Sequence, residues 1–363
     1  MKKLFSLVLT AAMVLTLAVP ALAATPGMDN FRKSETYTGF SDVPAGHWAA
    51  GVVQTCCEYA LMNGNPDGTF NLTGSLTVAE ALTMAARVHA IYTTGETFTA
   101  AGEPWYQPYV DDCVAAGIIT ADEFADYTAR ATRAQMAGIF DRALPAGELT
   151  VINTGAAPDV TDATPYAAEI RTLYAAGVLT GSDIYGTFLP GDTLTRAEAA
   201  AIIARIAIPA ERKSVTLMRD VQLTPAGTAA IPEDFADISA QAGMTGWGSE
   251  TGLFLYVTDT DANAYRGLTI EIMPAETVHE LLLETFGTAV SGLKTGTVKF
   301  GNLPAYRISF TYTGSGSSLP AVAYLYIDGD TLTMAVMAAL DSGILTAMAN
   351  NSRLNGSAAS PQL

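Results

Sequence analysis

The stretch NGNPDGTFNLTGSLTVAE, residues 63–80, determines how the first half of the chain is organised. It contains a Pro-Asp-Gly turn that is followed by an aromatic residue, Phe70. Further along, Thr77 and Glu80 have the spacing of a capping box, the pattern that precedes a helix. We therefore expect a helix, a turn and a second helix, the second running to about residue 91.

The same order of residues returns twice along the chain. In the first copy an aromatic residue, Trp48, precedes the capping threonine by 29 residues, and in the last copy Tyr166 precedes Thr195 by the same 29. A shorter copy lies between them, in which Trp105 precedes Thr132 by 27 residues and the Asp-Gly-Thr-Phe turn is missing. Matched residues at matched spacing indicate an internal repeat of about 60 residues, present in three copies.

These motifs resemble those of S-layer homology domains. The resemblance covers about residues 38–210, and it is carried by Phe-x-Asp-Val at 40–43, His-Trp-Ala at 47–49, the turn at 63–70 and Thr-Arg-Ala-Glu at 195–198. It implies an all-α pseudo-threefold bundle of three repeats, with a groove between each pair of neighbours. We expect the first, second and third copies at 24–94, 95–150 and 151–213.

The resemblance also implies a ligand. Grooves of this family bind secondary cell wall polysaccharide, often with pyruvylated sugars, and hold the protein without a covalent bond on the outside of a bacterial wall, in association with an S-layer. A pyruvyl group carries a carboxylate, so the groove needs a local cation in a chain with 36 acidic and 19 basic residues. The net charge of -17 argues against nucleic acid as a partner, because phosphate backbones would be repelled.

Arginine directly after a capping threonine suits such a carboxylate, because its planar fork and the helix N-terminus both donate hydrogen bonds to an anion. Arg133 and Arg196 occupy this position, whereas the first copy has Val78 there, so the groove that depends on position 78 is expected to be weak. The other expected ligand contacts are aromatic residues, two glycines and a turn aspartate: Trp48, Trp105, Tyr166, Gly64, Gly181 and Asp67. An alternative reading makes the tryptophans core anchors and the aspartate a turn residue.

The N-terminus predicts export. Lys2 and Lys3 precede an apolar stretch, and Ala21-Leu22-Ala23 matches a signal-peptidase site, so residues 1–23 are expected to be a removed signal peptide with no later membrane span. The three cysteines form no disulfide framework, and the three histidines show no ligand spacing to them. No metal or cofactor is therefore expected.

Residues 214–350 have a different composition, with β-branched and aromatic alternation in place of alanine-rich helices. We expect an α+β domain with an antiparallel sheet, helices at 275–286 and 342–350 on one face, and a flexible tail at 351–363. The expected strands are 215–223, 253–258, 268–273, 296–300, 305–312, 321–327 and 331–336. Asp328-Gly329 predicts a hairpin, and residues 301–329 weakly resemble PsbP-like domains, from which no site is transferred.

The tripled motif behind a leader predicts a secreted, wall-attached surface protein whose helical part is a non-enzymatic carbohydrate-binding anchor. Two alternatives stay open for residues 214–350: an enzyme that acts on peptidoglycan or wall glycan, and a module that binds another surface protein. His279 is the domain's only histidine, and its paired acids fall in expected turns. No catalytic residue is therefore assigned.

Overall fold

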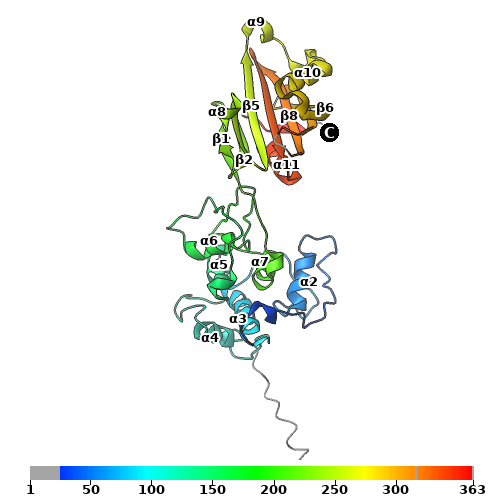
Figure 1. Ribbon diagram of the computed structural model, residues 1–363. Coiled ribbons are helices and arrows are strands. Elements are labelled where there is room, and N and C mark those ends of the chain that lie inside the picture. Colours follow the sequence, from blue (N-terminus) through cyan, green and yellow to red (C-terminus); the bar gives the residue numbers. More distant parts are fainter. Residues whose placement is uncertain (1–24, 315–316, 362–363) are drawn as a thin grey trace, which may run out of the picture. The chain divides into compact units, whose positions relative to one another are not determined.

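The computed structural model describes residues 25–314 and 317–361, so the expected signal peptide lies outside the described residues. The chain forms two compact units (Figure 1). The helical unit extends to Thr180 and resumes at Phe188–Ser214, and the C-terminal unit comprises Gly181–Thr187 and the residues from Val215 onward. Within the described ranges, no helix combines the length and the apolar character that crossing a membrane requires.

Three pairs of helices form the helical unit: α2 (Ala50–Glu58) and α3 (Val78–Thr94), α4 (Gln107–Ala115) and α5 (Arg133–Asp141), and α6 (Ala167–Ala175) and α7 (Arg196–Ala207). Short 3-10 helices lie at η1 (Met28–Asn30), η2 (Ala146–Glu148) and η3 (Pro209–Glu211). The second helix of each pair starts with a complete capping box, formed by Thr77 with Glu80, Thr132 with Gln135, and Thr195 with Glu198. The helix starts expected from the capping pattern are confirmed.

The three capped helix starts are linked to one another by backbone hydrogen bonds. In each copy, the first N–H of the second helix donates to a carbonyl in another copy: Arg196 to Gly74 at 2.8 Å, Arg133 to Asp192 at 2.7 Å and Val78 to Ala129 at 3.0 Å. The third copy thus contacts the first, the second contacts the third, and the first contacts the second. This cyclic order places side chains of different copies next to each other at every helix start.

The aspartate of the Asp-Val motif, at 42 and 159, explains why this motif recurs together with the turn that precedes the second helix. The carboxylate of Asp42 accepts hydrogen bonds from the backbone N–H groups of Phe70 and Asn71, both at 2.7 Å. Asp159 accepts the equivalent pair in the third copy at 2.8 and 2.7 Å. The second copy lacks this turn, and there the loop at 120–126 takes its place.

The cysteines are packing residues of the helical unit. Cys56, Cys57 and Cys113 are free thiols, and Cys56 and Cys113 are buried. Burial raises the pKa of the Cys113 thiol to about 12 and that of Cys57 to about 11. No group of three or more metal-ligating side chains occurs in the part of the chain that the structure describes.

The C-terminal unit contains an eight-stranded antiparallel sheet in the order β10-β6-β7-β8-β9-β5-β4-β3. Its strands are β3 (Ala236–Asp237), β4 (Thr245–Ser249), β5 (Gly252–Thr260), β6 (Val290–Phe300), β7 (Leu303–Tyr312), β8 (Leu319–Asp328), β9 (Thr331–Ala339) and β10 (Ala359–Pro361). A separate ribbon pairs β1 (Met218–Gln222) with β2 (Thr228–Pro232). The hairpin predicted at residues 328–329 is confirmed, since β8 and β9 pair with Asp328 opposite Thr331.

Helices cover both faces of this sheet, so the expectation that they share one face is wrong. Phe254 of β5 belongs to the core that α11 (Ser342–Asn351) covers, whereas the next residue, Leu255, belongs to the core that α10 (Ala275–Phe286) covers on the opposite face. The reason is that β8 and β9 are apolar on both faces, and both faces therefore need cover. Two short helices, α8 (Ser239–Ala242) and α9 (Ala262–Tyr265), complete the unit with η4 (Ile270–Ile272) and η5 (Gly287–Ala289).

Two further expectations for this unit are wrong. Residues 268–273 form no strand, because Ile270 alone of the segment's alternating apolar residues is buried, in the 3-10 helix η4, while Leu268 and Ile272 are exposed. The tail is not flexible from its start, since Ser352 and Leu354 are buried and β10 pairs with the end of β6.

The turn of the third copy belongs to the C-terminal unit although it lies between helices of the helical unit. Ile184 and Tyr185 pack against the core that α11 covers. The Tyr185 hydroxyl donates to Asp220 at 2.9 Å, and the Met218 N–H donates to the Ile184 carbonyl at 2.9 Å. The segment Gly181–Thr187 is therefore held by residues that follow it in the chain.

Candidate functional site

Arg196 begins α7, and its side chain is held by the first copy. Its Nε donates to the Phe70 carbonyl at 2.8 Å and its Nη2 to the Asn63 carbonyl at 2.9 Å. Nη1 lies 3.6 Å from the Glu80 carboxylate, and the guanidinium lies 4.9 Å from the centre of the Phe70 ring. The side chain is only 11% exposed, and burial lowers the pKa of Arg196 from its ordinary value. This guanidinium is therefore fixed and partly desolvated before any ligand arrives.

A hollow of about 180 Å³ opens beside Arg196. Its lining comes from all three copies: the loop 62–65 and α3 of the first, Trp105 of the second and Arg196 of the third. Three residues expected from the sequence, Gly64, Trp105 and Arg196, thus come together. A second hollow of about 360 Å³ shares Met62, Asn63, Gly64 and Arg87 with the first.

Arg87 lines both hollows and was not identified from the sequence. Its Nε–H is buried and has no hydrogen-bond partner among the described residues. With the Asn63 amide turned so that its oxygen faces the guanidinium, Nη2 donates to that oxygen at 3.2 Å. A buried donor without a partner is uncommon in folded proteins, so the surroundings of Arg87 are not fully satisfied by the described residues alone. The missed signal is that an arginine follows every capping threonine by ten residues, at 87, 142 and 205.

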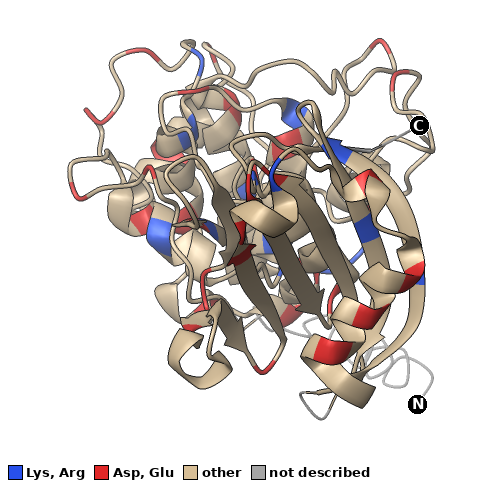
Figure 2. Ribbon diagram, turned by 90° about the horizontal axis from the view of Figure 1, so that it is seen from above, with Lys and Arg blue, Asp and Glu red and all other residues tan. Residues whose placement is uncertain are grey.

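The hollow combines positive charge with an exposed aromatic ring. In the chain as a whole acidic residues outnumber basic ones, 36 to 19, and they are coloured red and blue in Figure 2. Two guanidiniums, those of Arg87 and Arg196, line it together with one carboxylate, that of Glu80. The Trp105 ring is 52% exposed, so it is no core anchor, and it leaves an apolar surface free beside the cations. Such a combination can bind an anionic sugar, with the arginines on the acid group and the indole on the apolar face of the ring.

Arg133 of the second copy makes with the third copy the contacts that Arg196 makes with the first. Its Nε donates to the Phe188 carbonyl at 2.6 Å, and its Nη1 lies 3.4 Å from the Glu198 carboxylate. The guanidinium lies 5.1 Å from the centre of the Phe188 ring. Trp48, the other tryptophan expected at a groove, is 63% exposed and lies beside His47.

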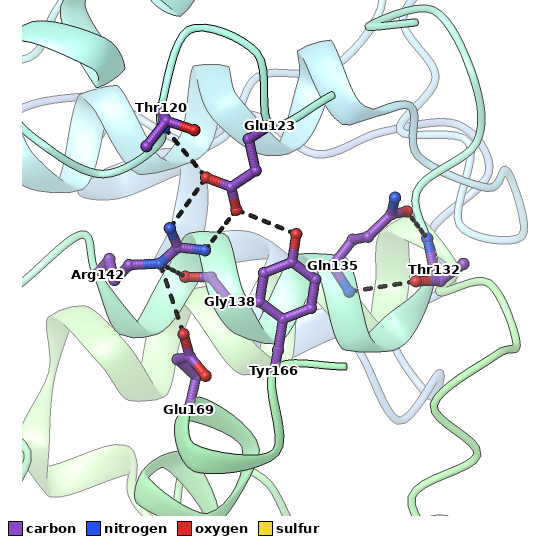
Figure 3. A network of polar contacts seen from close by, with 8 residues as sticks. All are labelled: Thr120, Glu123, Thr132, Gln135, Gly138, Arg142, Tyr166 and Glu169. Carbon is purple, nitrogen blue, oxygen red and sulfur yellow. Dashed lines mark hydrogen bonds and ion pairs between the residues drawn. The ribbon is translucent and has the colours of Figure 1, made fainter. Parts of the chain in front are cut away.

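The remaining expected residues have structural roles that the fold makes clear. A Cβ on Gly64 would lie 2.0 Å from the Phe40 ring, so this glycine permits close packing as well as lining the hollows. Gly181 lies in the C-terminal unit with a φ of +77°, and Asp67 closes its turn by accepting from the Thr69 N–H and hydroxyl. Tyr166 donates its hydroxyl hydrogen to Glu123 at 3.0 Å, in a network centred on Arg142 (Figure 3).

The comparisons with known proteins agree with these motifs. The model of the S-layer homology domain matches residues 39–71 and 158–200. S-layer protein EA1 of Bacillus anthracis is 26% identical over 210 residues, which cover 56% of this chain and 22% of that protein. The S-layer protein of Bacillus licheniformis is 27% identical over 247 residues, covering 62% of this chain and 26% of that protein.

A third relative, the S-layer protein of Bacillus thuringiensis subsp. finitimus, is 28% identical over 212 residues, or 56% of this chain and 24% of that protein. The aligned part thus spans about a quarter of the length of these curated relatives. The two matched segments contain Asp42 and Asp159, together with the turns whose backbone N–H groups donate to these carboxylates. The resemblance inferred from the motifs is confirmed, since residues 39–71 and 158–200 match the S-layer homology domain.

Proposed function

We propose that this chain is a secreted surface protein that its helical unit holds at a bacterial cell wall without a covalent bond. The S-layer homology match and the S-layer relatives support wall anchoring. The observation that carries the proposal is the meeting of Arg87, Trp105 and Arg196 around one hollow. The expected leader at residues 1–23 would deliver the chain to that surface.

The helical unit is proposed to be a pseudo-threefold bundle of the three copies. The cyclic hydrogen bonds at the helix starts support this arrangement, since each copy contacts both others in the same way. The shortened second copy takes part in full, because it supplies Trp105 to the hollow and Arg133 to the third copy.

The ligand is proposed to be an acidic secondary cell wall polysaccharide, with a pyruvylated sugar as its recognised group. The carboxylate would accept from the guanidiniums of Arg87 and Arg196, which both line the hollow. A hydrogen bond to a charged group contributes about 1.5–3 kcal/mol, so the loss of one arginine should be measurable. In a chain with a net charge of -17, only such a local cluster of cations can hold an anionic polymer.

The C-terminal unit is proposed to be a displayed, non-enzymatic module. The titratable side chains considered for catalysis have hydrogen-bond partners within this unit. His279 Nε2 lies 2.6 Å from the Thr295 hydroxyl, and Asp259 accepts from the Tyr265 hydroxyl at 2.7 Å. Asp261 caps α9 through the N–H groups of Asn263 and Ala264.

Sedimentation with purified wall sacculi tests the anchoring proposal. Residues 24–363 should sediment with sacculi and stay in solution once the secondary polymer has been stripped from them. The double variant Arg133→Ala, Arg196→Ala should lose sedimentation while its circular dichroism stays that of a folded protein. Arg171→Ala is the control, because Arg171 is an exposed residue paired only with Asp162 among the described residues. Equal binding to stripped sacculi would overturn the proposal.

A further inference from the structure

Beside α5, at the place that corresponds to the hollow beside α3, the chain's own side chains contact one another (Figure 3). We call this place the groove beside α5. Counting from the capping threonine, Arg142 corresponds to Arg87 and Gly138 to Thr83. Tyr166 corresponds to Trp105, as the aromatic residue of the following copy. The two sites therefore share a frame, but they differ at position 138, whose counterpart in α3 is a threonine, and in the side chains that occupy them.

Glu123 accepts four hydrogen bonds in this groove. Arg142 donates to it through Nη2 at 2.7 Å and through Nη1 at 3.1 Å. The Tyr166 hydroxyl donates at 3.0 Å and the Thr120 N–H at 3.1 Å, so that each carboxylate oxygen accepts two bonds. The Glu123 side chain is 14% exposed. A free carboxylate ligand could not be satisfied more fully.

The electrostatics of the groove keep Glu123 charged and Tyr166 protonated. Burial alone would raise the pKa of Glu123, but the hydrogen bonds from Arg142 and from the Thr120 N–H lower it below its ordinary value. Burial and the bond to Glu123 raise the pKa of Tyr166 to about 12. The arginine also has Glu169 3.9 Å from its Nε, and its guanidinium lies 5.6 Å from the centre of the Tyr166 ring.

A glycine admits the tyrosine ring into the groove. A Cβ on Gly138 would lie 2.2 Å from the Tyr166 ring and 2.9 Å from the Arg142 guanidinium. In α3 the equivalent residue is Thr83, which lines the open hollow. The ring can therefore lie against α5 only because position 138 has no side chain.

We propose that Glu123 is an intramolecular ligand, which occupies an anion seat formed by Arg142, Tyr166 and the Thr120 N–H. In the native chain this groove is closed to acidic sugars, and once the carboxylate is removed the seat takes a small free carboxylate such as acetate. The identity of the excluded sugar rests on the proposed function, whereas the existence of the seat does not.

Chemical rescue tests this seat in the full chain. Glu123→Ala should lower the midpoint of thermal unfolding by several degrees. Sodium acetate at 50 mM should then raise the midpoint of the variant by about 2 °C more than that of the native chain, relative to sodium chloride at equal ionic strength. If Glu123→Ala is unfolded in chloride, the refolding yield in acetate and in chloride is compared instead.

Two control variants make the result specific. Glu123→Gln fills the seat with a neutral amide and should show no acetate response. Asp162→Ala removes a carboxylate from the exposed Arg171 and should show none either. An acetate-dependent rise of the unfolding midpoint that is equal in all chains, or that is absent in Glu123→Ala, would contradict the proposed anion seat. Sedimentation with sacculi is measured separately, so a failure of wall binding leaves this result unaffected.

Discussion

Helices α3 and α5 have the same repeat frame and opposite surroundings. The arginine of α3, Arg87, lines an open hollow, and its Nε–H has no partner among the described residues. The arginine of α5, Arg142, instead donates two hydrogen bonds to the carboxylate of Glu123. The residues that make the difference lie outside the recurring motifs, at positions such as Gly138 and Glu123. A repeat can therefore keep its fold and lose its site through a few residues that the motif does not specify.

The arginine-carboxylate pairs between copies differ at positions that do belong to the motif. Arg196 lies 3.6 Å from Glu80, and Arg133 lies 3.4 Å from Glu198. In the cyclic order the third pair would join positions 78 and 135, which hold valine and glutamine. Both charged partners are absent together, which avoids an unpaired charge at a half-buried contact.

The largest expected effect comes from removing the cation of the closed groove. Arg142→Met should destabilise the chain by about 3 kcal/mol, because Glu123 is left with a poorly paired charge in a largely buried position. Arg171→Met, at an exposed pair, should cost less than about 0.5 kcal/mol. Urea unfolding of both variants measures the difference. Similar losses would show that Arg142 is no more important than a surface residue.

A smaller effect is expected from a side chain at position 138. Gly138→Ala should cost about 2 kcal/mol, because its Cβ would clash with the Tyr166 ring. Thr83→Ala, at the matching position of the open hollow, should be nearly neutral, since alanine is the better helix former. Thermal unfolding of both variants tests this. An unchanged midpoint for Gly138→Ala would mean that the ring moves aside without cost.

The open hollow should respond in binding and hardly in stability. Arg87→Ala should weaken sedimentation with sacculi about tenfold, a change of about 1.4 kcal/mol. The unfolding midpoint should change little, because Arg87 loses only the hydrogen bond from Nη2 to Asn63 and its Nε–H has no partner among the described residues. Loss of stability with unchanged wall binding would assign Arg87 to the fold and not to the site.

The smallest effect concerns Asp141, at the end of α5. Its Oδ1 is buried without a hydrogen-bond partner in the described chain, and burial followed by repulsion from Glu169 raises the pKa of Asp141 to about 6. The folded state thus binds the proton of the Asp141 carboxyl group more tightly than the unfolded state does. The ionised carboxylate therefore destabilises the fold fully above pH 6, and the effect disappears below about pH 4, where the group is protonated in both states.

Asp141→Asn should therefore stabilise the chain by about 1 kcal/mol at pH 7.5, after allowance for solvent screening, and by nothing near pH 3.5. The comparison is made by urea unfolding of the native and variant chains at both pH values. A gain that is equal at both would show that the carboxylate's charge is not its cause.

The sequence was sufficient to predict local features of the fold. Capping boxes and the Pro-Asp-Gly turn depend on residues a few positions apart, and they located the three capped helices correctly. Local patterns gave a wrong prediction at residues 268–273, where apolar residues alternate as in a strand but form the 3-10 helix η4. They also could not predict β10 in the tail, because its partner strand β6 lies some 60 residues earlier in the chain.

The site was predicted in part for the same reason. Arg196, Gly64 and Trp105 could be proposed from motif position alone, and they do line one hollow. The closure by Glu123 could not be predicted, because its partners Arg142 and Tyr166 lie 19 and 43 residues away and meet it only in the folded chain. Arg87 could have been found, since its spacing from the capping threonine recurs in every copy.

The placement of Gly181–Thr187 in the C-terminal unit has a mechanical consequence. The backbone passes between the two units at three points, after Thr180, after Thr187 and after Ser214. Tension on the C-terminal unit would thus be shared among three backbone connections as long as the turn of the third copy, which two of them flank, stays packed in that unit. Truncation of the chain after residue 214 would remove one connection and leave Ile184 and Tyr185 without the core that they pack against.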